Sequence, residues 1–121
     1  MSYYKVATVA DLPASGGLPI ELGRDRIAIF RCGPDGAQYF AINDLCPHRG
    51  APLSEGYLES DKVFCPWHCF DFNLRTGEST IATHLCVTTY PVQVDEDEAI
   101  WILYPDELID VKEGGDLSDD L

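Results

Sequence analysis

Short apolar stretches rich in valine, isoleucine, threonine and aromatic residues alternate with turn residues along most of the chain. This pattern predicts β-strands, because β-branched and aromatic side chains pack well on a pleated surface. The predicted strands are Tyr3–Val9, Arg26–Cys32, Gln38–Asn43, Lys62–Cys65, Cys86–Val94 and Ala99–Tyr104. The turn signals between them are Gly33–Gly36, Thr76–Gly77 and Asp95–Glu98. Helical periodicity persists nowhere for three turns, and only Ala10–Pro13 is expected to form a helical turn. The sequence therefore predicts an all-β fold, an antiparallel sandwich or barrel.

Two segments that interrupt or end this strand pattern carry the candidate metal ligands. The segment Leu45–Tyr57 holds two prolines and two glycines, and Cys65–Phe72 directly follows a predicted strand. The four candidate ligands are Cys46 and His48 in the first segment and Cys65 and His68 in the second. We expect two hairpin tips that meet over one metal centre, because strands hold ligand-bearing loops rigidly.

Three kinds of site could use two cysteines and two histidines: a disulfide framework, a zinc site or an iron–sulfur cluster. The chain has five cysteines, an odd number, so a complete internal disulfide framework is excluded. Structural zinc accepts this ligand set, although zinc fingers more often pair Cys with Cys and His with His along the chain. Here each segment contributes one of each, which favours the cluster over zinc.

The two segments resemble the ligand loops of Rieske [2Fe-2S] proteins, in the runs 46–56 and 65–77. The resemblance covers about residues 3 to 104 and implies a Rieske-type antiparallel β-sandwich with one [2Fe-2S] cluster. In such centres two Cys hold one iron and two His hold the other. By this resemblance, Cys46 and Cys65 bind the inner iron, while His48 and His68 bind the outer iron and form the exit for electrons.

The resemblance also implies a low potential within the Rieske range of roughly −150 to +300 mV. High-potential members have a second Cys in each loop, and a Ser and a Tyr that donate hydrogen bonds to the cluster or its ligand sulfurs. The corresponding residues here are Ala51, Trp67, Phe70 and Phe72, which lack these groups. The residues expected to surround the cluster are Pro66, Trp67, Cys69 and Phe70, and Cys69 stands where the family usually has glycine.

The charge of the chain restricts its partners. Its 121 residues include 21 acidic and 8 basic side chains, for a net charge of −13. Such a surface repels phosphate backbones and anionic lipids, so we expect no nucleic-acid or membrane partner but a basic protein partner. The acidic clusters Asp95–Glu98 and 106–121 are the candidates for electrostatic docking.

Length and the chain ends predict one domain in the cytoplasm. We expect a Rieske domain over residues 1–105 and an acidic, frayed tail over residues 106–121. The first residues lack the features of a signal peptide, and no run approaches eighteen apolar residues. A soluble, reducing environment is therefore expected.

Four further residues have simpler expectations. Cys32 and Cys86 lie in apolar predicted strands and should be small core residues. Trp101, in an alternating strand, should also belong to the core. His84 has no ligand partner nearby in the sequence and should lie at the surface.

The sequence shows none of the usual catalytic arrangements: no phosphate-binding loop, no nucleophile elbow and no facial triad for mononuclear iron. We predict an electron carrier, not an enzyme, with no small-molecule substrate of its own. The resemblance implies a ferredoxin of an aromatic-ring-hydroxylating dioxygenase system, which carries single electrons from a flavin-dependent reductase to the terminal oxygenase. One alternative is the small Rieske-like subunit of an NAD(P)H-dependent nitrite reductase, although many of these lack the four ligands that this chain keeps. A structural zinc or interaction domain is the third hypothesis.

Overall fold

Strands account for most of the regular structure in the computed structural model, which describes residues 1–14, 16–32, 38–47, 50–66, 70–81 and 84–111. The strands are β1 (Ser2–Thr8), β2 (Leu18–Leu22), β3 (Asp25–Cys32), β4 (Gln38–Asn43), β5 (Tyr57–Glu59), β6 (Lys62–Phe64), β7 (Asp71–Asn73), β8 (Thr89–Tyr90), β9 (Val92–Val94) and β10 (Ala99–Tyr104). Three short 3₁₀-helices are also described: η1 (Val9–Asp11), η2 (Leu53–Glu55) and η3 (Asp106–Val111).

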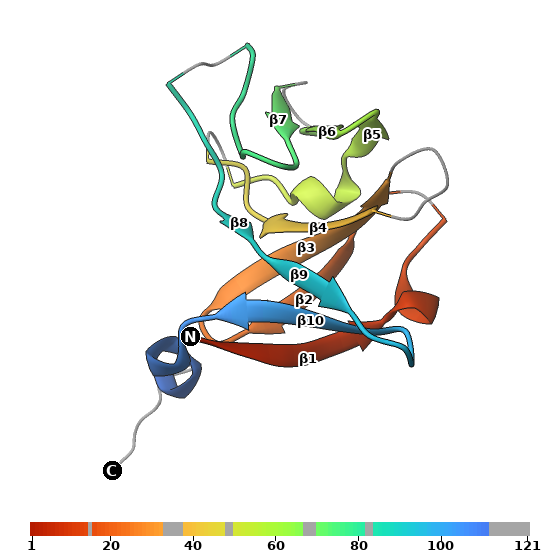
Figure 1. Cartoon of the computed structure of the whole chain (residues 1–121). Coiled ribbons are helices and arrows are strands. Elements are labelled where there is room, and N and C mark those ends of the chain that lie inside the picture. The colour runs from red at the N-terminus through yellow and green to blue at the C-terminus, as the bar shows by residue number, and fades with distance from the viewer. Residues whose placement is uncertain (15, 33–37, 48–49, 67–69, 82–83, 112–121) are drawn as a thin grey trace.

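These strands form three antiparallel sheets, which confirms the predicted all-β fold. The orders are β1-β10-β9, β2-β3-β4-β8 and β5-β6-β7. Figure 1 shows the first two sheets together in the lower body of the molecule and the small β5-β6-β7 sheet above them. The second sheet therefore lies between the other two.

The middle position of β3 explains why both of its faces are apolar. Ile27 and Ile29 pack in a core with Ile100 and Ile102 of β10. Ala28, Phe30 and Cys32 pack in a second core, which also includes Val63 and Phe72 of the small sheet. Side chains alternate between the two faces of a strand, so successive residues of β3 serve different cores. Residues 27–30 are all fully buried as a result.

The second core joins the small sheet to the body. Phe30 of β3 is fully buried in it together with Val63 of β6 and Phe72 of β7. Burying each such side chain contributes about 1.5–3 kcal/mol. A Cβ at Gly17 would lie 2.7 Å from the Phe30 ring, so the close approach of the chain to this ring requires glycine. The small sheet is thus fixed to β3 by apolar packing.

The predicted strands match the structure best where apolar runs are longest. β4 and β10 have the predicted bounds, β3 and β6 differ from theirs by one residue at one end, and β1 is shifted by one residue at both ends. The helical turn expected at Ala10–Pro13 occurs as η1, which begins one residue earlier and ends two residues earlier. The turns at Thr76–Gly77 and Asp95–Glu98 are present, whereas the predicted turn Gly33–Gly36 lies outside the described residues.

The prediction of one strand over Cys86–Val94 is wrong. Pro91 separates β8 from β9, and these two strands pair with different sheets. Proline has no N–H to donate to a ladder, so the chain leaves one sheet and enters the other at this residue. Three strands were missed, namely β2, which contains a proline, and β5 and β7, which have three residues each.

The start of the expected frayed tail is ordered, so that expectation is wrong for Asp106–Val111. These residues form η3, and Leu108 and Ile109 pack against the core that contains Ile100. Asp106 accepts a hydrogen bond from the Tyr4 hydroxyl and lies 3.0 Å from the N-terminal amino group. The N-terminus and η3 accordingly lie together in Figure 1. Residues 112–121 lie outside the described part, so the division at residue 105 stays a prediction.

The burial expected for four single residues is confirmed for two of them and wrong for the other two. Cys32 is buried and His84 is exposed, as expected. Cys86 is exposed, because it lies in the connection before β8, paired with Glu78 in an isolated bridge, and not in a core strand. Trp101 is only half-buried, since it lies on the outer face of β10. Among the described residues, no helix is long and apolar enough to cross a membrane.

Candidate metal centre

The structure describes half of the predicted ligand set. Cys46 and Cys65 are 1% and 0% exposed and belong to one buried cluster. Neither takes part in a disulfide with another described cysteine. His48 and His68 lie outside the described residues, as do Trp67 and Cys69. The structure therefore brings together the two loops that carry the predicted inner-iron ligands.

The first ligand loop, residues 46–51, is closed by its own backbone. The N–H of Cys46 donates to the carbonyl of Ala51 at 2.8 Å, and the N–H of Gly50 donates to the carbonyl of Cys46 at 2.7 Å. Gly50 has a φ of +76°, a conformation that glycine adopts without strain. An isolated bridge between Leu45 and Pro52 extends this closure. The two ends of the loop are thus bonded to each other directly at a buried cysteine.

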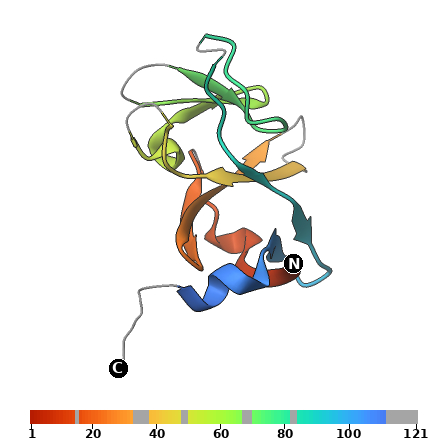
Figure 2. The same cartoon turned by 90° about the vertical axis from the view of Figure 1, so that its left-hand side faces the viewer.

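The second ligand loop, residues 65–70, is closed in the same way. It is the connection between β6 and β7, and the N–H of Cys65 donates to the carbonyl of Phe70 at 2.7 Å. In both loops the bond joins the cysteine to the residue five positions later. Figures 1 and 2 show the segment between β4 and η2 beside the β5-β6-β7 sheet at the same end of the molecule. Two loops that are closed by the same kind of backbone bond therefore lie at the same end of the molecule.

The interior around the two cysteines is apolar. Ala51 and Phe72 are fully buried in the same cluster as both cysteines, and Phe70 packs against that cluster half-buried. These are three of the four residues that lack the hydrogen-bond donors of high-potential members. Two buried cysteines at the start of matched loops fit the two thiolate ligands of a Rieske cluster. The described residues contain no group of three His, Cys, Asp or Glu side chains placed to hold a metal ion.

Two buried carboxylates, which the sequence analysis missed, fix the bases of the ligand loops. Asp44, fully buried, accepts the N–H of Ser54 at 2.6 Å and forms an ion pair with Arg26 of β3. Asp71, 2% exposed, accepts hydrogen bonds from the segment 79–81. The sequence shows only their positions: Asp44 stands two residues before Cys46, and Asp71 directly follows Phe70, the last residue of the second loop.

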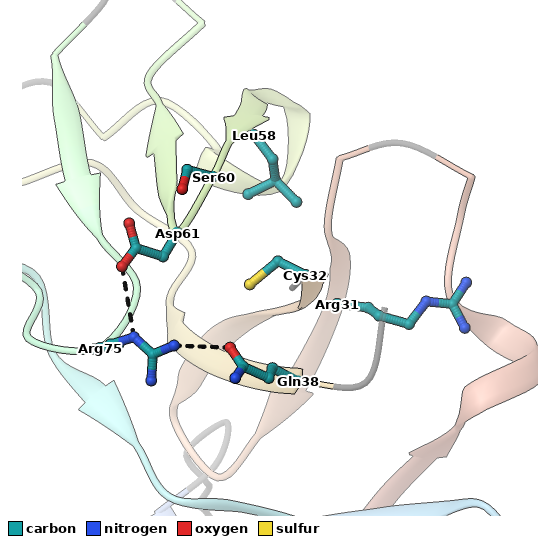
Figure 3. A pocket seen from close by; sticks show the side chains of 7 residues that line it. All are labelled: Arg31, Cys32, Gln38, Leu58, Ser60, Asp61 and Arg75. Carbon is teal, nitrogen blue, oxygen red and sulfur yellow. Dashed lines mark hydrogen bonds and ion pairs between the residues drawn. The ribbon is translucent and has the colours of Figure 1, made fainter. Parts of the chain in front are cut away.

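A pocket outside the two ligand loops lies between β3, β4 and the small sheet (Figure 3). Its lining consists of Arg31, Cys32, Gln38, Leu58, Ser60, Asp61 and Arg75. Arg75 lies 3.5 Å from a carboxylate oxygen of Asp61 and donates to Gln38 at 2.8 Å, while the Arg31 side chain points away. Burial raises the pKa of the Cys32 thiol, which keeps it protonated. The contacts of Arg75 tie the small sheet to β4. The pocket offers no reactive thiolate, because its one cysteine is protonated.

The comparisons with known proteins agree with the loop geometry. A model of the Rieske [2Fe-2S] domain family matches residues 2–91, which include both ligand loops. This chain belongs to the Rieske [2Fe-2S] domain family. The predicted cofactor, one Rieske-type [2Fe-2S] cluster, is thereby confirmed.

Within this Rieske family, the chain is similar to dioxygenase ferredoxins. It is 43% identical, over 72% of its own length and 80% of the relative, to the 3-phenylpropionate/cinnamic acid dioxygenase ferredoxin subunit of Escherichia coli (strain K12). It also resembles the ferredoxin of carbazole 1,9a-dioxygenase from Nocardioides aromaticivorans IC177. That likeness has a TM-score of 0.73 and 30% identity over 84% of this chain and 97% of that one.

Two further solved structures bear on partners and on the alternative function. One comes from a complex of reduced oxygenase and oxidized ferredoxin in carbazole 1,9a-dioxygenase, with a TM-score of 0.70, 28% identity and 83% and 100% coverage of this chain and that one. The other is a Mycobacterium tuberculosis protein provisionally assigned as an NADH-dependent nitrite reductase small subunit. It has a TM-score of 0.75 but 22% identity, over 84% and 93% of the two chains, and so shows the fold alone.

Proposed function

We propose that this Rieske protein is the ferredoxin of an aromatic-ring-hydroxylating dioxygenase system, carrying single electrons from a flavin-dependent reductase to the terminal oxygenase. The observation that carries the proposal is the pair of buried cysteines, Cys46 and Cys65, at the start of two matched loops. They occur in a chain 43% identical to a protein named as a dioxygenase ferredoxin subunit. The relatives are named as electron-transfer components, which agrees with the predicted absence of catalysis.

The proposal assigns Cys46 and Cys65 to the inner iron and His48 and His68 to the outer iron. The burial pattern supports this order, because Pro47 and Pro66 are exposed directly after the two buried cysteines. In each loop the chain therefore runs outward from the cysteine to the proline that follows it. A bound Rieske cluster supplies reversible one-electron chemistry. The burial of Cys46 and Cys65 excludes water from the thiolate side of the proposed centre.

The acidic turn Asp95–Glu98 does not support docking at the electron exit. It connects β9 to β10, and Figure 1 shows that connection at the opposite end of the molecule from β5-β6-β7. A partner that docks on this turn would be far from the ligand loops. We propose that the electron-transfer partners dock instead at the loop end, where Leu45 is 49% and Ile81 58% exposed. The acidic turn then acts only as a distant charge.

The nitrite reductase subunit stays the alternative, supported by the likeness in fold. Identity separates the two hypotheses: 43% to a dioxygenase ferredoxin subunit against 22% to the nitrite reductase protein. The presence of all four candidate ligands also favours the free carrier.

Metal analysis followed by electron exchange tests the proposal. The purified protein should contain two irons and two sulfides per chain and show a Rieske-type electron paramagnetic resonance signal after reduction. It should then be oxidised rapidly by a ring-hydroxylating oxygenase and slowly by a sirohaem nitrite reductase. One zinc and no sulfide per chain would contradict the cluster, and the reverse order of rates would favour the nitrite reductase subunit.

A further inference from the structure

Four polar or charged residues of the described part are buried, and each one flanks a ligand loop or is hydrogen-bonded to a residue that does. They are Asp44 and Ser54 around the first loop and Asp71 and Ser79 near the second. Burying a polar group costs free energy unless it is hydrogen-bonded, so such groups usually occur where geometry must be held. Their position points to a task at the metal centre.

Asp71 joins the second ligand loop to a turn that is otherwise separate from it. It is the first residue of β7 and follows Phe70, whose carbonyl closes the loop onto Cys65. Its Oδ1 accepts the Ser79 hydroxyl at 3.1 Å and the Thr80 N–H at 2.9 Å.

Two further bonds complete the set around Asp71. Oδ1 also accepts the Ile81 N–H at 3.3 Å, and Oδ2 accepts the Thr80 hydroxyl. The turn Ser79–Ile81 is thereby fastened directly to the base of the second loop.

The charge of Asp71 is held mainly by neutral donors. The Lys62 amino group lies 3.7 Å away and is partly exposed, whereas Asp44 pairs directly with Arg26. Burial alone would raise the pKa of Asp71. The hydrogen bonds from Thr80, Ser79 and Ile81 outweigh this effect, so the pKa lies below its ordinary value. The carboxylate is therefore ionised at neutral pH and keeps all of its acceptor positions.

We propose that Asp71 is a positioning residue of the cluster site, which fixes the turn Ser79–Ile81 against the second ligand loop and so sets the reduction potential. The inference rests on the proposed function, because it takes Cys65 and His68 as ligands. Groups that hold metal ligands tune the metal through ligand orientation and access of water. If the turn is released, water approaches the loop and stabilises the more negative reduced state. Loss of Asp71 therefore raises the potential.

The test compares three substitutions that separate position from charge. Asp71→Ala removes every bond to the turn. Asp71→Asn removes the charge but keeps Oδ1 as an acceptor, and its amide can donate to the Thr80 hydroxyl. Thr80→Val removes the hydroxyl bond to Asp71 and keeps the main-chain N–H of residue 80. It is the substitute variant if Asp71→Ala does not fold.

The matched control is Asp95→Ala. Asp95 also organises a turn, since it accepts the N–H groups of Asp97 and Ala99, each at 2.9 Å, and the Trp101 indole N–H at 2.9 Å. Its turn, however, lies at the other end of the molecule (Figure 1). A general loss of stability should affect both variants, whereas a change at the cluster should affect Asp71 variants alone.

Voltammetry and electron paramagnetic resonance of the iron-loaded proteins give the result. Asp71→Ala should shift the equilibrium of electron exchange with a reference couple about three- to tenfold towards the reduced protein. A tenfold change corresponds to a rise of about 59 mV in the reduction potential. Its resonance signal should broaden, Asp71→Asn should stay within twofold of wild type, and Thr80→Val should lie between the two.

Three results would overturn the proposal. The first is an Asp71→Ala potential and signal equal to wild type, and the second is a Thr80→Val protein equal to wild type when Asp71→Ala cannot be prepared. An equal shift in Asp71→Asn and Asp71→Ala is the third, because charge would then account for the effect. A wild-type protein without iron and sulfide would instead refute the proposed function.

Discussion

The Asp44 carboxylate accepts the main-chain N–H of Ser54 at 2.6 Å and so joins the two ends of the first ligand loop. Asp44 also accepts the N–H of Leu53 at its carbonyl, at 2.6 Å, and pairs with Arg26 through the other carboxylate oxygen. One buried residue thereby fastens the loop that carries Cys46 to the middle sheet.

Asp44→Ala should loosen this loop and reduce cluster loading. The substitution leaves the Ser54 N–H without its acceptor in the interior, which costs about 1–3 kcal/mol. Urea unfolding and iron content per chain measure the two effects. Asp25→Ala, which removes the hydrogen-bond partner of the Tyr104 hydroxyl and lies outside both ligand loops, is the control. Normal iron content in Asp44→Ala would show that the loop holds its shape without the aspartate.

Cys46→Ser and Cys65→Ser should each lose the cluster and much of the stability of the loop end together. Both thiols are buried, and metal binding is coupled to folding where few other contacts hold the ligand loops. Cys86→Ser, at an exposed cysteine outside both loops, is the matched control and should keep its iron. Iron loss in all three variants would mean that cysteine substitution perturbs the fold in general.

The wild-type potential should lie near the bottom of the Rieske range, because Ala51, Phe70 and Phe72 offer no donor to sulfur. Phe72→Tyr and Phe70→Ser should raise it by some tens of millivolts if the new hydroxyl reaches a ligand sulfur. Phe40→Tyr, on β4 beside Arg75, is the control and should leave the potential unchanged. A wild-type potential near the top of the range, measured by voltammetry, would refute the argument from missing donors.

Tyr104 should make the fold sensitive to alkali. Burial, together with the hydrogen bond and charge of Asp25, raises the pKa of Tyr104 to about 12. Because the folded value exceeds the unfolded value of about 10, the contribution of Tyr104 is complete below pH 10 and is lost as the pH rises towards 12. Wild type should therefore lose more thermal stability between pH 10 and 12 than Tyr104→Phe does. Parallel curves for the two proteins would contradict the shifted pKa.

Charge substitutions should distinguish the two ends of the molecule. Changing Glu96, Asp97 and Glu98 to their amides should barely alter electron transfer at physiological salt, where the Debye length is about 8 Å. Changing Glu55 and Glu78, which are exposed and stand next to the buried Ser54 and Ser79, should alter the salt dependence of electron transfer. Electron-transfer rates at sub-saturating carrier, measured from low salt to 0.5 M, provide the comparison. A larger effect of the Glu96–Glu98 set would place the docking surface at the distal turn.

The sequence predicted most strands of the two larger sheets and the family to which the chain belongs. The alternation in β10 and the apolar run of β3 indicate strands from local pattern alone. The Cys/His spacing identified both ligand loops, because the ligands are close together in the sequence. β7 was missed because three residues, one of them Asp71, carry no strand pattern of their own. The side-chain partners of Asp44 and Asp71 lie eight to eighteen residues away in the chain, where only folding reveals them.

Because β3 lies between two cores, the register of this one strand decides which side chains pack beneath the metal centre. A single-residue insertion before Ile27 would exchange its two faces and turn the isoleucines towards the ligand loops. It would also turn Ala28 and Phe30 towards Ile100 and Ile102, whose contacts are shaped for other side chains. Laboratory evolution of this protein should therefore accept insertions in its turns and reject them in β3, even though β3 contributes none of the four proposed ligands.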